Sequence, residues 1–188
     1  MRGRRLLVEI LQTVALTVVA FYLLQAFVAQ PFRVEQGSMR VTLEPGEYVL
    51  ADKVTPHLTG YHRGDVVIFH PPADWSGHDA GTPYIKRVIG LPGETVDLKD
   101  GKVAINGIPM VEPYVYLDEG ADSVGDDGHW VLGPDQLLVF GDHRSNSSDS
   151  RAYGPISIQD VVGRAVFRYF PLDRFTLIVA PAYPGFTP

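Results

Sequence analysis

The 188-residue sequence contains no cysteine. This absence excludes disulfide bonds, zinc thiolates and a thiol nucleophile, so covalent catalysis would have to use serine, threonine or lysine. It leaves the redox compartment of the protein undetermined.

Positive charge is also scarce, with a formal net charge of -6 and a pI near 5.4. Phosphate binding normally needs a basic patch, so we expect no nucleic-acid partner. The six histidines are scattered without an H-x-x-x-H pair, and we therefore predict no metal site and no cofactor. They are His57, His62, His70, His78, His129 and His143.

Only one hydrophobic run is long. Residues Ile10 to Ala29 carry no charge, and as a helix they would span about 30 Å, the hydrocarbon thickness of a bilayer. The run predicts one transmembrane helix, with a buried core helix and a cleaved signal peptide as alternatives. The run exceeds the roughly 7 to 15 apolar residues of a signal peptide, and cleavage after Ala29 would place bulky Phe27 at position -3.

The charges that flank this run predict its orientation. Arg2, Arg4 and Arg5 precede it, whereas Arg33 and Arg40 follow more loosely, so we expect a cytoplasmic N-terminus. The expected organisation is a cytoplasmic segment 1–9, an anchor 10–29, an extracytoplasmic β-domain 30–175 and a C-terminal tail 176–188.

Beyond Pro31, short apolar runs alternate with glycine, proline, aspartate and asparagine, which predicts a mainly β fold. Asp100-Gly101 and Asn106-Gly107 are typical of hairpin turns. The segments 70–83 and 117–128 are expected to be surface loops, and the tail P-A-Y-P-G-F-T-P is expected to extend freely. The runs predicted to be strands are E-Y-V-L-A-D-K-V, D-V-V-I-F-H, Y-I-K-R-V-I-G, K-V-A-I-N-G, Q-L-L-V-F and G-R-A-V-F-R-Y-F.

The stretch V-E-Q-G-S-M follows closely after the predicted anchor. It fits a linker, a ligand-binding turn or a nucleophile held at the membrane surface, because Gly37 permits close backbone approach and exposes the Ser38 hydroxyl. A serine nucleophile needs a base, and His143 in G-D-H-R is one candidate. A loop histidine on a polar surface is the alternative.

Lys86 is a second candidate base, because it lies in the apolar strand Y-I-K-R-V-I-G. An inward side chain would have a lowered pKa, and a shift from about 10.4 to near 7 corresponds to roughly 4 to 5 kcal/mol. Taken alone, the segment favours an edge lysine with its amine in water.

Four blocks in this order behind one anchor resemble bacterial type I signal peptidases, which are membrane-anchored Ser/Lys proteases. The resemblance implies Ser38 as nucleophile, Lys86 as general base and the Ser38 backbone N–H as an oxyanion donor. It further implies that Ser147 orients the lysine amine, that Asp149 and Arg151 form an ion pair holding their loop, and that Gly141 leaves room beside the lysine. The blocks are G-S-M-R-V-T-L, G-D-V-V-I-F, Y-I-K-R-V-I-G-L-P-G-E and G-D-H-R-S-N-S-S-D-S-R-A-Y-G.

The chain departs from the family pattern at three positions. Val41 replaces the usual proline, Gln36 stands where a serine, threonine or glycine is common, and His143 stands where asparagine is common. A glutamine amide can donate a hydrogen bond, so Gln36 is a candidate second oxyanion donor.

The resemblance implies a catalytic β-domain of coiled antiparallel sheets, similar to signal peptidases and self-cleaving repressors, behind one transmembrane helix. The expected activity removes signal peptides from exported preproteins after small residues of the Ala-x-Ala type, through an acyl-enzyme. The expected partners are signal peptides and the lipid bilayer, and the expected location is the bacterial plasma membrane. Residues 32–34 could form one wall of a substrate pocket, and Arg168 to Phe175 could dip into the lipid interface or simply end a strand.

Three other functions fit parts of the pattern. A self-cleaving Ser/Lys repressor relative would share the fold and dyad, but it needs a soluble DNA-binding module. A membrane-anchored β-domain could bind a partner without catalysis. A Ser-His-Asp hydrolase predicts that His143→Ala abolishes activity, whereas a Ser/Lys dyad predicts near-normal turnover for that variant if it folds.

Overall fold

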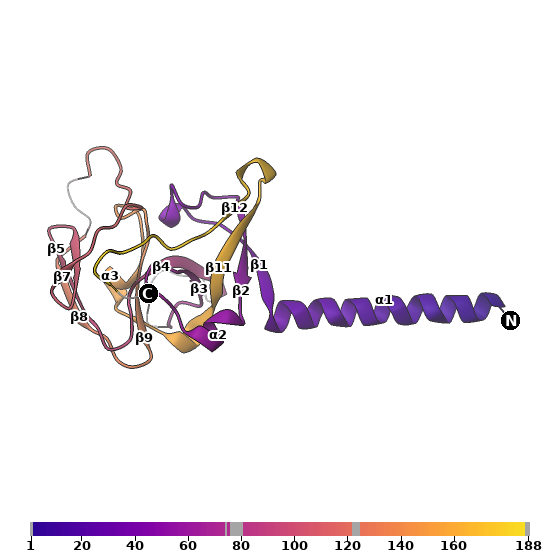
Figure 1. Cartoon of the computed structure of the whole chain (residues 1–188). Coiled ribbons are helices and arrows are strands. Elements are labelled where there is room, and N and C mark those ends of the chain that lie inside the picture. The colour runs from indigo at the N-terminus through magenta and orange to yellow at the C-terminus, as the bar shows by residue number, and fades with distance from the viewer. Residues whose placement is uncertain (1, 74, 76–80, 122–124, 187–188) are drawn as a thin grey trace.

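The computed structural model describes residues 2–73, 75, 81–121 and 125–186, and it shows a long N-terminal helix that projects from a β-domain (Figure 1). Helix α1 spans Arg2–Phe27, and its apolar part, Gly3–Phe27, is long enough to cross a membrane, with none of its hydrophobic window buried by the rest of the protein. The helix therefore begins before the predicted span. It also ends before Ala29, which instead starts strand β1.

The mainly β prediction is confirmed. The larger sheet has eight strands, and its neighbouring strands pair antiparallel. Its order is β1 (Ala29–Arg33), β2 (Tyr48–Asp52), β11 (Val161–Phe170), β3 (Val66–Phe69), β4 (Tyr84–Gly90), β9 (Gln136–Phe140) and β10 (Ile156–Ser157), with β12 (Thr176–Leu177) paired to β11.

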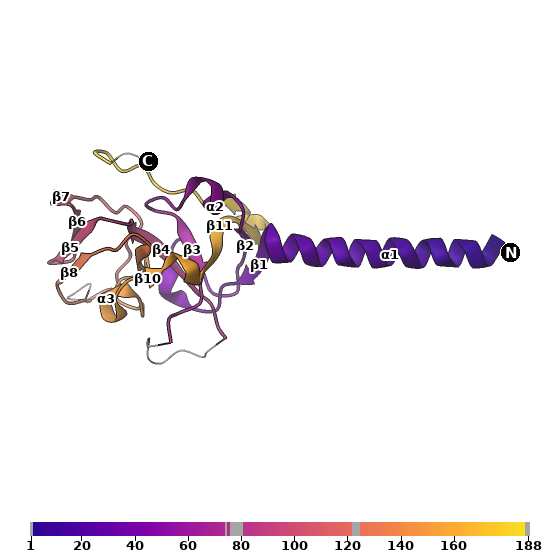
Figure 2. The same cartoon turned by 90° about the horizontal axis from the view of Figure 1, so that it is seen from below.

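A second sheet lies at the end of the domain far from α1 (Figures 1 and 2). Both predicted turns occur in it: Asp100 and Gly101 have φ of 48° and 74°, and Asn106 and Gly107 have φ of 51° and 80°. These left-handed conformations are the ones that tight hairpins require. The order is β7 (Ile108–Pro109), β6 (Lys102–Ile105), β5 (Thr95–Lys99) and β8 (Gly128–Val131).

Short helices connect the strands. They are α2 (Thr55–Thr59), α3 (Ser150–Tyr153) and the 3-10 turns η1 (Gly37–Met39), η2 (Ile158–Asp160) and η3 (Leu172–Arg174). Strand β3 is buried along its whole length, and β4 and β9 are buried except at Ile85 and Gln136, so these strands form the centre of the core. A side chain on β4 is therefore removed from water by the fold itself.

The C-terminal tail P-A-Y-P-G-F-T-P does not extend freely, so that prediction is wrong for its described residues, 181–186. Strand β12 pairs with β11, and further along the chain Tyr183 and Phe186 pack against the core beneath the second sheet. The Arg63 guanidinium lies 4.9 Å from the centre of the Phe186 ring. Aromatic residues in a proline-rich tail can bury enough apolar surface to hold it down.

The two predicted loops fall partly outside the described residues, namely at 74, 76–80 and 122–124. Within the described part of 70–83, Trp75 is not on the surface, because only 2% of it is exposed and its ring contacts Phe69 and Tyr84. This tryptophan attaches its loop to the apolar centre of the domain.

Candidate active site

Ser38 lies on η1, a single 3-10 turn that apolar side chains fix in place. Met39 and Leu43 are buried, and the Leu43 N–H donates to the Met39 carbonyl at 2.7 Å. Both side chains belong to the same core cluster as Val34, which precedes the turn. Ser38 itself retains 7% exposure, so its hydroxyl is held at the edge of the core.

Lys86 points into the protein from strand β4. Only 1% of it is exposed, and its Nζ lies 2.7 Å from Ser38 Oγ and 3.2 Å from the Ile85 carbonyl oxygen. The alternative of an edge lysine with its amine in water is therefore wrong. Pairing of β4 with β9 begins one residue later, at Arg87 opposite Phe140, which leaves space at Lys86 for the serine turn.

Burial lowers the pKa of the Lys86 amine to about 8. The nearby Asp149 carboxylate acts in the opposite direction, and the Arg151 guanidinium adds to the lowering. The amine also lies 5.0 Å from the centre of the Tyr84 ring. A lysine with a pKa near 8 has a substantial neutral fraction close to physiological pH and can accept a proton.

Gly141 and Ser147 approach each other behind the serine turn. A Cβ atom at Gly141 would lie 2.6 Å from the Ser38 carbonyl oxygen and would collide with Ser147 Oγ, so only glycine fits. Ser147 Oγ is buried and has no hydrogen-bond partner among the described residues. The bond from Ser147 to the lysine amine is thus not formed in this structure, and the orienting role of Ser147 stays a prediction.

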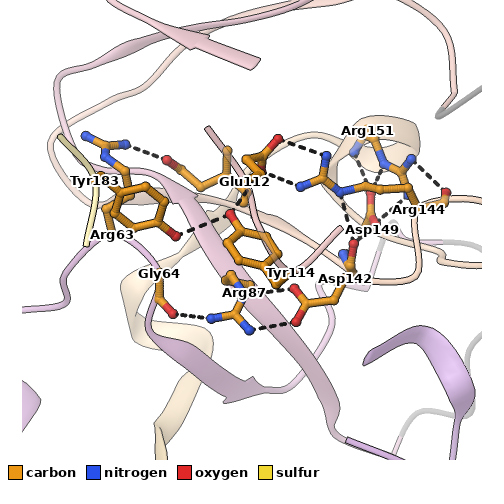
Figure 3. Close-up of polar contacts among 12 residues, drawn as sticks. Arg63, Gly64, Arg87, Glu112, Tyr114, Asp142, Arg144, Asp149, Arg151 and Tyr183 are labelled. Atoms are coloured by element: carbon orange, nitrogen blue, oxygen red, sulfur yellow. Dashed lines mark hydrogen bonds and ion pairs between the residues drawn. The ribbon is translucent and has the colours of Figure 1, made fainter. Parts of the chain in front are cut away.

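Asp149 and Arg151 form an ion pair, with Arg151 Nη2 2.8 Å from Asp149 Oδ2 (Figure 3). Asp149 also caps α3 and accepts the Gly141 N–H at 2.9 Å. Burial alone would raise the pKa of this carboxyl, but the Arg151 hydrogen bonds and charge, together with the Gly141 N–H, hold the pKa below its ordinary value. The pair therefore ties Gly141 to the loop that follows it.

Two further buried ion pairs were not predicted from the sequence. Arg87 donates two hydrogen bonds to Asp142, at 2.8 and 2.6 Å (Figure 3). Arg144 forms an ion pair with Glu112 (Figure 3). Thr42, four residues after the nucleophile, donates to Asp142 at 2.5 Å. The sequence signal for the first of these pairs is Arg87, a second charged residue next to Lys86 inside an apolar strand. A buried charge requires a partner of opposite charge.

A cleft runs past Ser38 and Lys86 between two chain segments, residues 33–36 and 82–86. Gln36 lies on this cleft, is exposed, and makes no capping bond to η1. Strand β1 is at the edge of its sheet, paired to β2 on one side only, and its last residue, Arg33, lines the cleft. An extended peptide can pair with such an edge.

His143 is 1% exposed and lies next to Ser38 in space, but its ring nitrogens contact other groups. Nδ1 is 3.1 Å from the Gly37 carbonyl oxygen and Nε2 is 2.8 Å from Asp118 Oδ2. The ring therefore makes no bond to the Ser38 hydroxyl, which speaks against His143 as the base. Within the residues that the structure describes, no cluster of three or more histidine or acidic side chains could hold a metal ion.

Comparison with known proteins identifies the family to which the sequence is similar. Residues 7–170 match the family model described as signal peptidase, peptidase S26. The chain is 39% identical to a probable signal peptidase I-1 of Synechocystis sp. over 81% of this chain and 77% of that protein. It is 37% identical to a signal peptidase I of Leptolyngbya laminosa over 89% of this chain and 82% of that protein. A crystal structure of a signal peptidase I from Enterococcus faecalis V583 superposes with a TM-score of 0.47 at 28% identity, covering 55% of this chain and 95% of that one.

Proposed function

Because the chain belongs to the signal peptidase family, peptidase S26, and is a serine endopeptidase, we propose that it cleaves signal peptides from preproteins with a Ser38–Lys86 dyad. The observation that carries this proposal is the separation of 2.7 Å between Lys86 Nζ and Ser38 Oγ in a buried site. At this distance the amine can take the hydroxyl proton directly.

The proposed reaction has two stages. Neutral Lys86 takes the Ser38 proton while Ser38 Oγ attacks the scissile carbonyl carbon, and the protonated lysine then gives the proton to the leaving amine. Water next attacks the acyl carbon while Lys86 accepts a proton from the water, the ester bond to Ser38 Oγ breaks, and Lys86 returns the proton to Ser38 Oγ. The Ser38 N–H donates to no acceptor among the described residues and would stabilise the oxyanion, with the exposed amide of Gln36 as a second donor.

Substrate choice follows from the shape of the cleft. We propose that the peptide lies extended between residues 33–36 and 82–86, so that side chains at -1 and -3 point to the same face. Val34, Met39 and Ile85 supply apolar walls near the nucleophile, and Val34 and Met39 are almost completely buried. A pocket with apolar walls of this kind would admit small residues such as alanine.

We also propose that residues 1–9 are cytoplasmic, that 10–27 form most of the membrane anchor, and that the β-domain lies on the extracytoplasmic side of the plasma membrane. The helix α1 supports the anchor, and the arginines before it support the orientation. A substrate in the same bilayer would meet the enzyme at a raised effective concentration.

Processing of a membrane-presented preprotein tests the proposal. Wild-type protein should cleave after an Ala-x-Ala site, Ser38→Ala and Lys86→Ala should lose detectable cleavage, and Lys102→Ala, an exposed lysine on the second sheet, should match wild type. Replacing alanine at -1 or -3 of the substrate with leucine should block cleavage. Activity in a correctly folded Lys86→Ala protein would overturn the dyad.

A further inference from the structure

His143 lies against the backbone on both sides of the nucleophile, although it does not touch the Ser38 hydroxyl. Its ring Nδ1 is 3.1 Å from the Gly37 carbonyl oxygen, and its own backbone N–H donates to the Ser38 carbonyl at 3.0 Å. One residue therefore holds two consecutive peptide units. The first contains the Gly37 carbonyl and the Ser38 N–H, and the second begins with the Ser38 carbonyl.

The chain places Asp118 behind the imidazole ring. The segment around Tyr116 runs beside His143, with the Tyr116 N–H bonded to the Asp142 carbonyl and the Arg144 N–H bonded to the Tyr116 carbonyl. Two residues later Asp118 Oδ2 meets His143 Nε2 at 2.8 Å and accepts the Ser145 hydroxyl at 3.0 Å. The Tyr116 ring packs edge-on against the imidazole at 4.9 Å between centroids.

Both partners of the ring are acceptors, since one is a carbonyl oxygen and the other a carboxylate oxygen. Nδ1–H donates to the Gly37 carbonyl, and the Asp118 carboxylate holds the ring from its Nε2 side. The bond to the Gly37 carbonyl polarises the peptide unit whose other end is the Ser38 N–H. A polarised and fixed N–H is a stronger donor to a developing oxyanion.

We propose that the His143–Asp118 pair is a positioning device that orients and polarises the oxyanion-binding peptide of Ser38. This inference rests on the proposed function, because it assigns the Ser38 N–H to the oxyanion. His143 is a positioning residue and Asp118 acts through it. We accordingly expect His143→Ala to lower turnover below the near-normal value that the dyad alone predicts, without abolishing it as loss of a general base would.

Asp118 offers the cleaner test, because its side chain is 49% exposed and its removal leaves the core intact. The chain also contains a matched control in Asp97, which is 43% exposed and contacts His129 Nδ1 at 2.6 Å on the second sheet. Asp118→Ala removes the Asp118 carboxylate, and with it both the negative charge beside His143 Nε2 and the contact that supports the imidazole ring. Asp118→Asn keeps a polar partner for the ring, because an amide N–H can donate to a neutral Nε2 while Nδ1–H still bonds the Gly37 carbonyl.

The experiment measures kcat and KM on an Ala-x-Ala peptide, and inhibition by the matching peptide aldehyde. Ser38 Oγ adds to the aldehyde carbon, the hydroxyl proton passes to Lys86, and the carbonyl oxygen occupies the oxyanion position. Loss of a whole oxyanion donor costs about 10²–10³ in rate, so its partial weakening in Asp118→Ala should cost about tenfold in kcat. We expect an unchanged KM and an equal loss of aldehyde affinity.

Asp118→Asn should fall between wild type and Asp118→Ala, and Asp97→Ala should equal wild type. If Asp118→Ala matches Asp97→Ala in kcat and aldehyde affinity, or if it changes KM alone, the positioning role is overturned. Failure of the proposed function is distinguishable, since the wild-type protein would then neither cleave the peptide nor bind the aldehyde.

Discussion

At the scale of single residues, the amine of Lys86 is the most costly group in the site, because it is buried without an ion pair to any described carboxylate. Its pKa falls from 10.5 to about 8. At about 1.36 kcal/mol for each pKa unit, the protonated form is disfavoured in the folded state by roughly 3 kcal/mol. The proposed base therefore reduces the stability of the fold that holds it.

Lys86→Met should consequently abolish turnover and raise the free energy of unfolding at pH 7 by up to about 3 kcal/mol. In the wild type the unfolded chain binds more protons than the folded chain between pH 8 and 10.5, so stability rises with pH across this window. The advantage of Lys86→Met should therefore be full below pH 8 and shrink toward pH 10.5. Denaturant titrations at several pH values measure this, and a pH-independent difference would contradict it.

At Val41 the backbone has a conformation that the proline of the family pattern would not predict. Its φ is 79°, in the left-handed region that costs a β-branched residue about 1–2 kcal/mol. Proline, which the family usually has here, is locked near −65° and could not adopt this turn. Val41 therefore holds a backbone conformation after Ser38 that proline could not adopt.

Val41→Pro should destabilise the protein and slow cleavage, because it also removes the N–H that bonds Glu44 Oε1 at 3.3 Å. Val41→Gly should be neutral or stabilising by up to about 1 kcal/mol, because glycine adopts positive φ without strain. Thermal unfolding and cleavage rates compare the two variants. A Val41→Pro protein as stable as wild type would show that the turn has another conformation in solution.

The proposed catalytic residues and the ion pair beside them were predictable from the sequence, but most of their contacts were not. Ser38, Lys86, Asp149 and Arg151 stand in short motifs whose order implied their roles. The burial of Lys86 depends on where pairing with β9 begins, which no local pattern encodes. The contact of His143 with Asp118 joins two loops 25 residues apart, and only tertiary structure brings them together.

At the scale of elements, the connection between β11 and β12 has an apolar surface on the side of the domain from which α1 projects (Figures 1 and 2). Phe170, Leu172 and Phe175 are 49%, 78% and 59% exposed. Arg168 bonds the Thr42 carbonyl at 3.1 Å and Glu47 at 3.2 Å, which ties this connection to the loop after the nucleophile. These exposed apolar side chains support a proposal of contact with the lipid interface, which stays a prediction.

Leu172→Asp should therefore weaken binding of the protein to the surface of lipid vesicles and lower cleavage of membrane-presented preprotein, while cleavage of a short soluble peptide stays unchanged. Val131→Asp is the control, because Val131 is 70% exposed on the second sheet, far from α1. Equal effects of the two substitutions on preprotein cleavage would refute lipid contact by this connection.

Strands such as β3, β4 and β11 were predictable because their short apolar runs are bounded by turn residues. Strands β7, β8, β10 and β12 match none of the predicted runs. Strand β1 was not predicted, because Ala29 to Arg33 continues the end of the hydrophobic run and resembles its exit from the membrane. The docking of the tail was missed as well. It depends on contacts such as that of the Tyr183 and Tyr114 hydroxyls, 3.3 Å apart, between residues remote in sequence.

At the scale of the whole molecule, the proposed anchor α1 is exposed and apolar and is joined directly to edge strand β1, an arrangement that would place the cleft close to the bilayer surface. The Lys53 N–H bonds the Val28 carbonyl at 2.9 Å, so the end of the anchor is tied to the β-domain. A cleavage site presented just outside the membrane would therefore lie within reach of Ser38. The proposed orientation puts the basic N-terminus on the opposite side.

Labelling can test this orientation, because the chain has no native cysteine. A membrane-impermeant maleimide applied to intact cells should modify Lys99→Cys, at an exposed position of the second sheet, and should spare Gly3→Cys until the membrane is permeabilised. The reverse pattern would invert the proposed topology.

The central claim, that neutral Lys86 activates Ser38, is tested most directly by the pH dependence of single-turnover cleavage of an Ala-x-Ala substrate. We predict that the wild-type rate rises with pH through about 8, where the buried amine loses its proton, and that folded Lys86→Met shows no cleavage at any pH. A folded Lys86→Met protein that retains the wild-type rate and pH profile would contradict the claim.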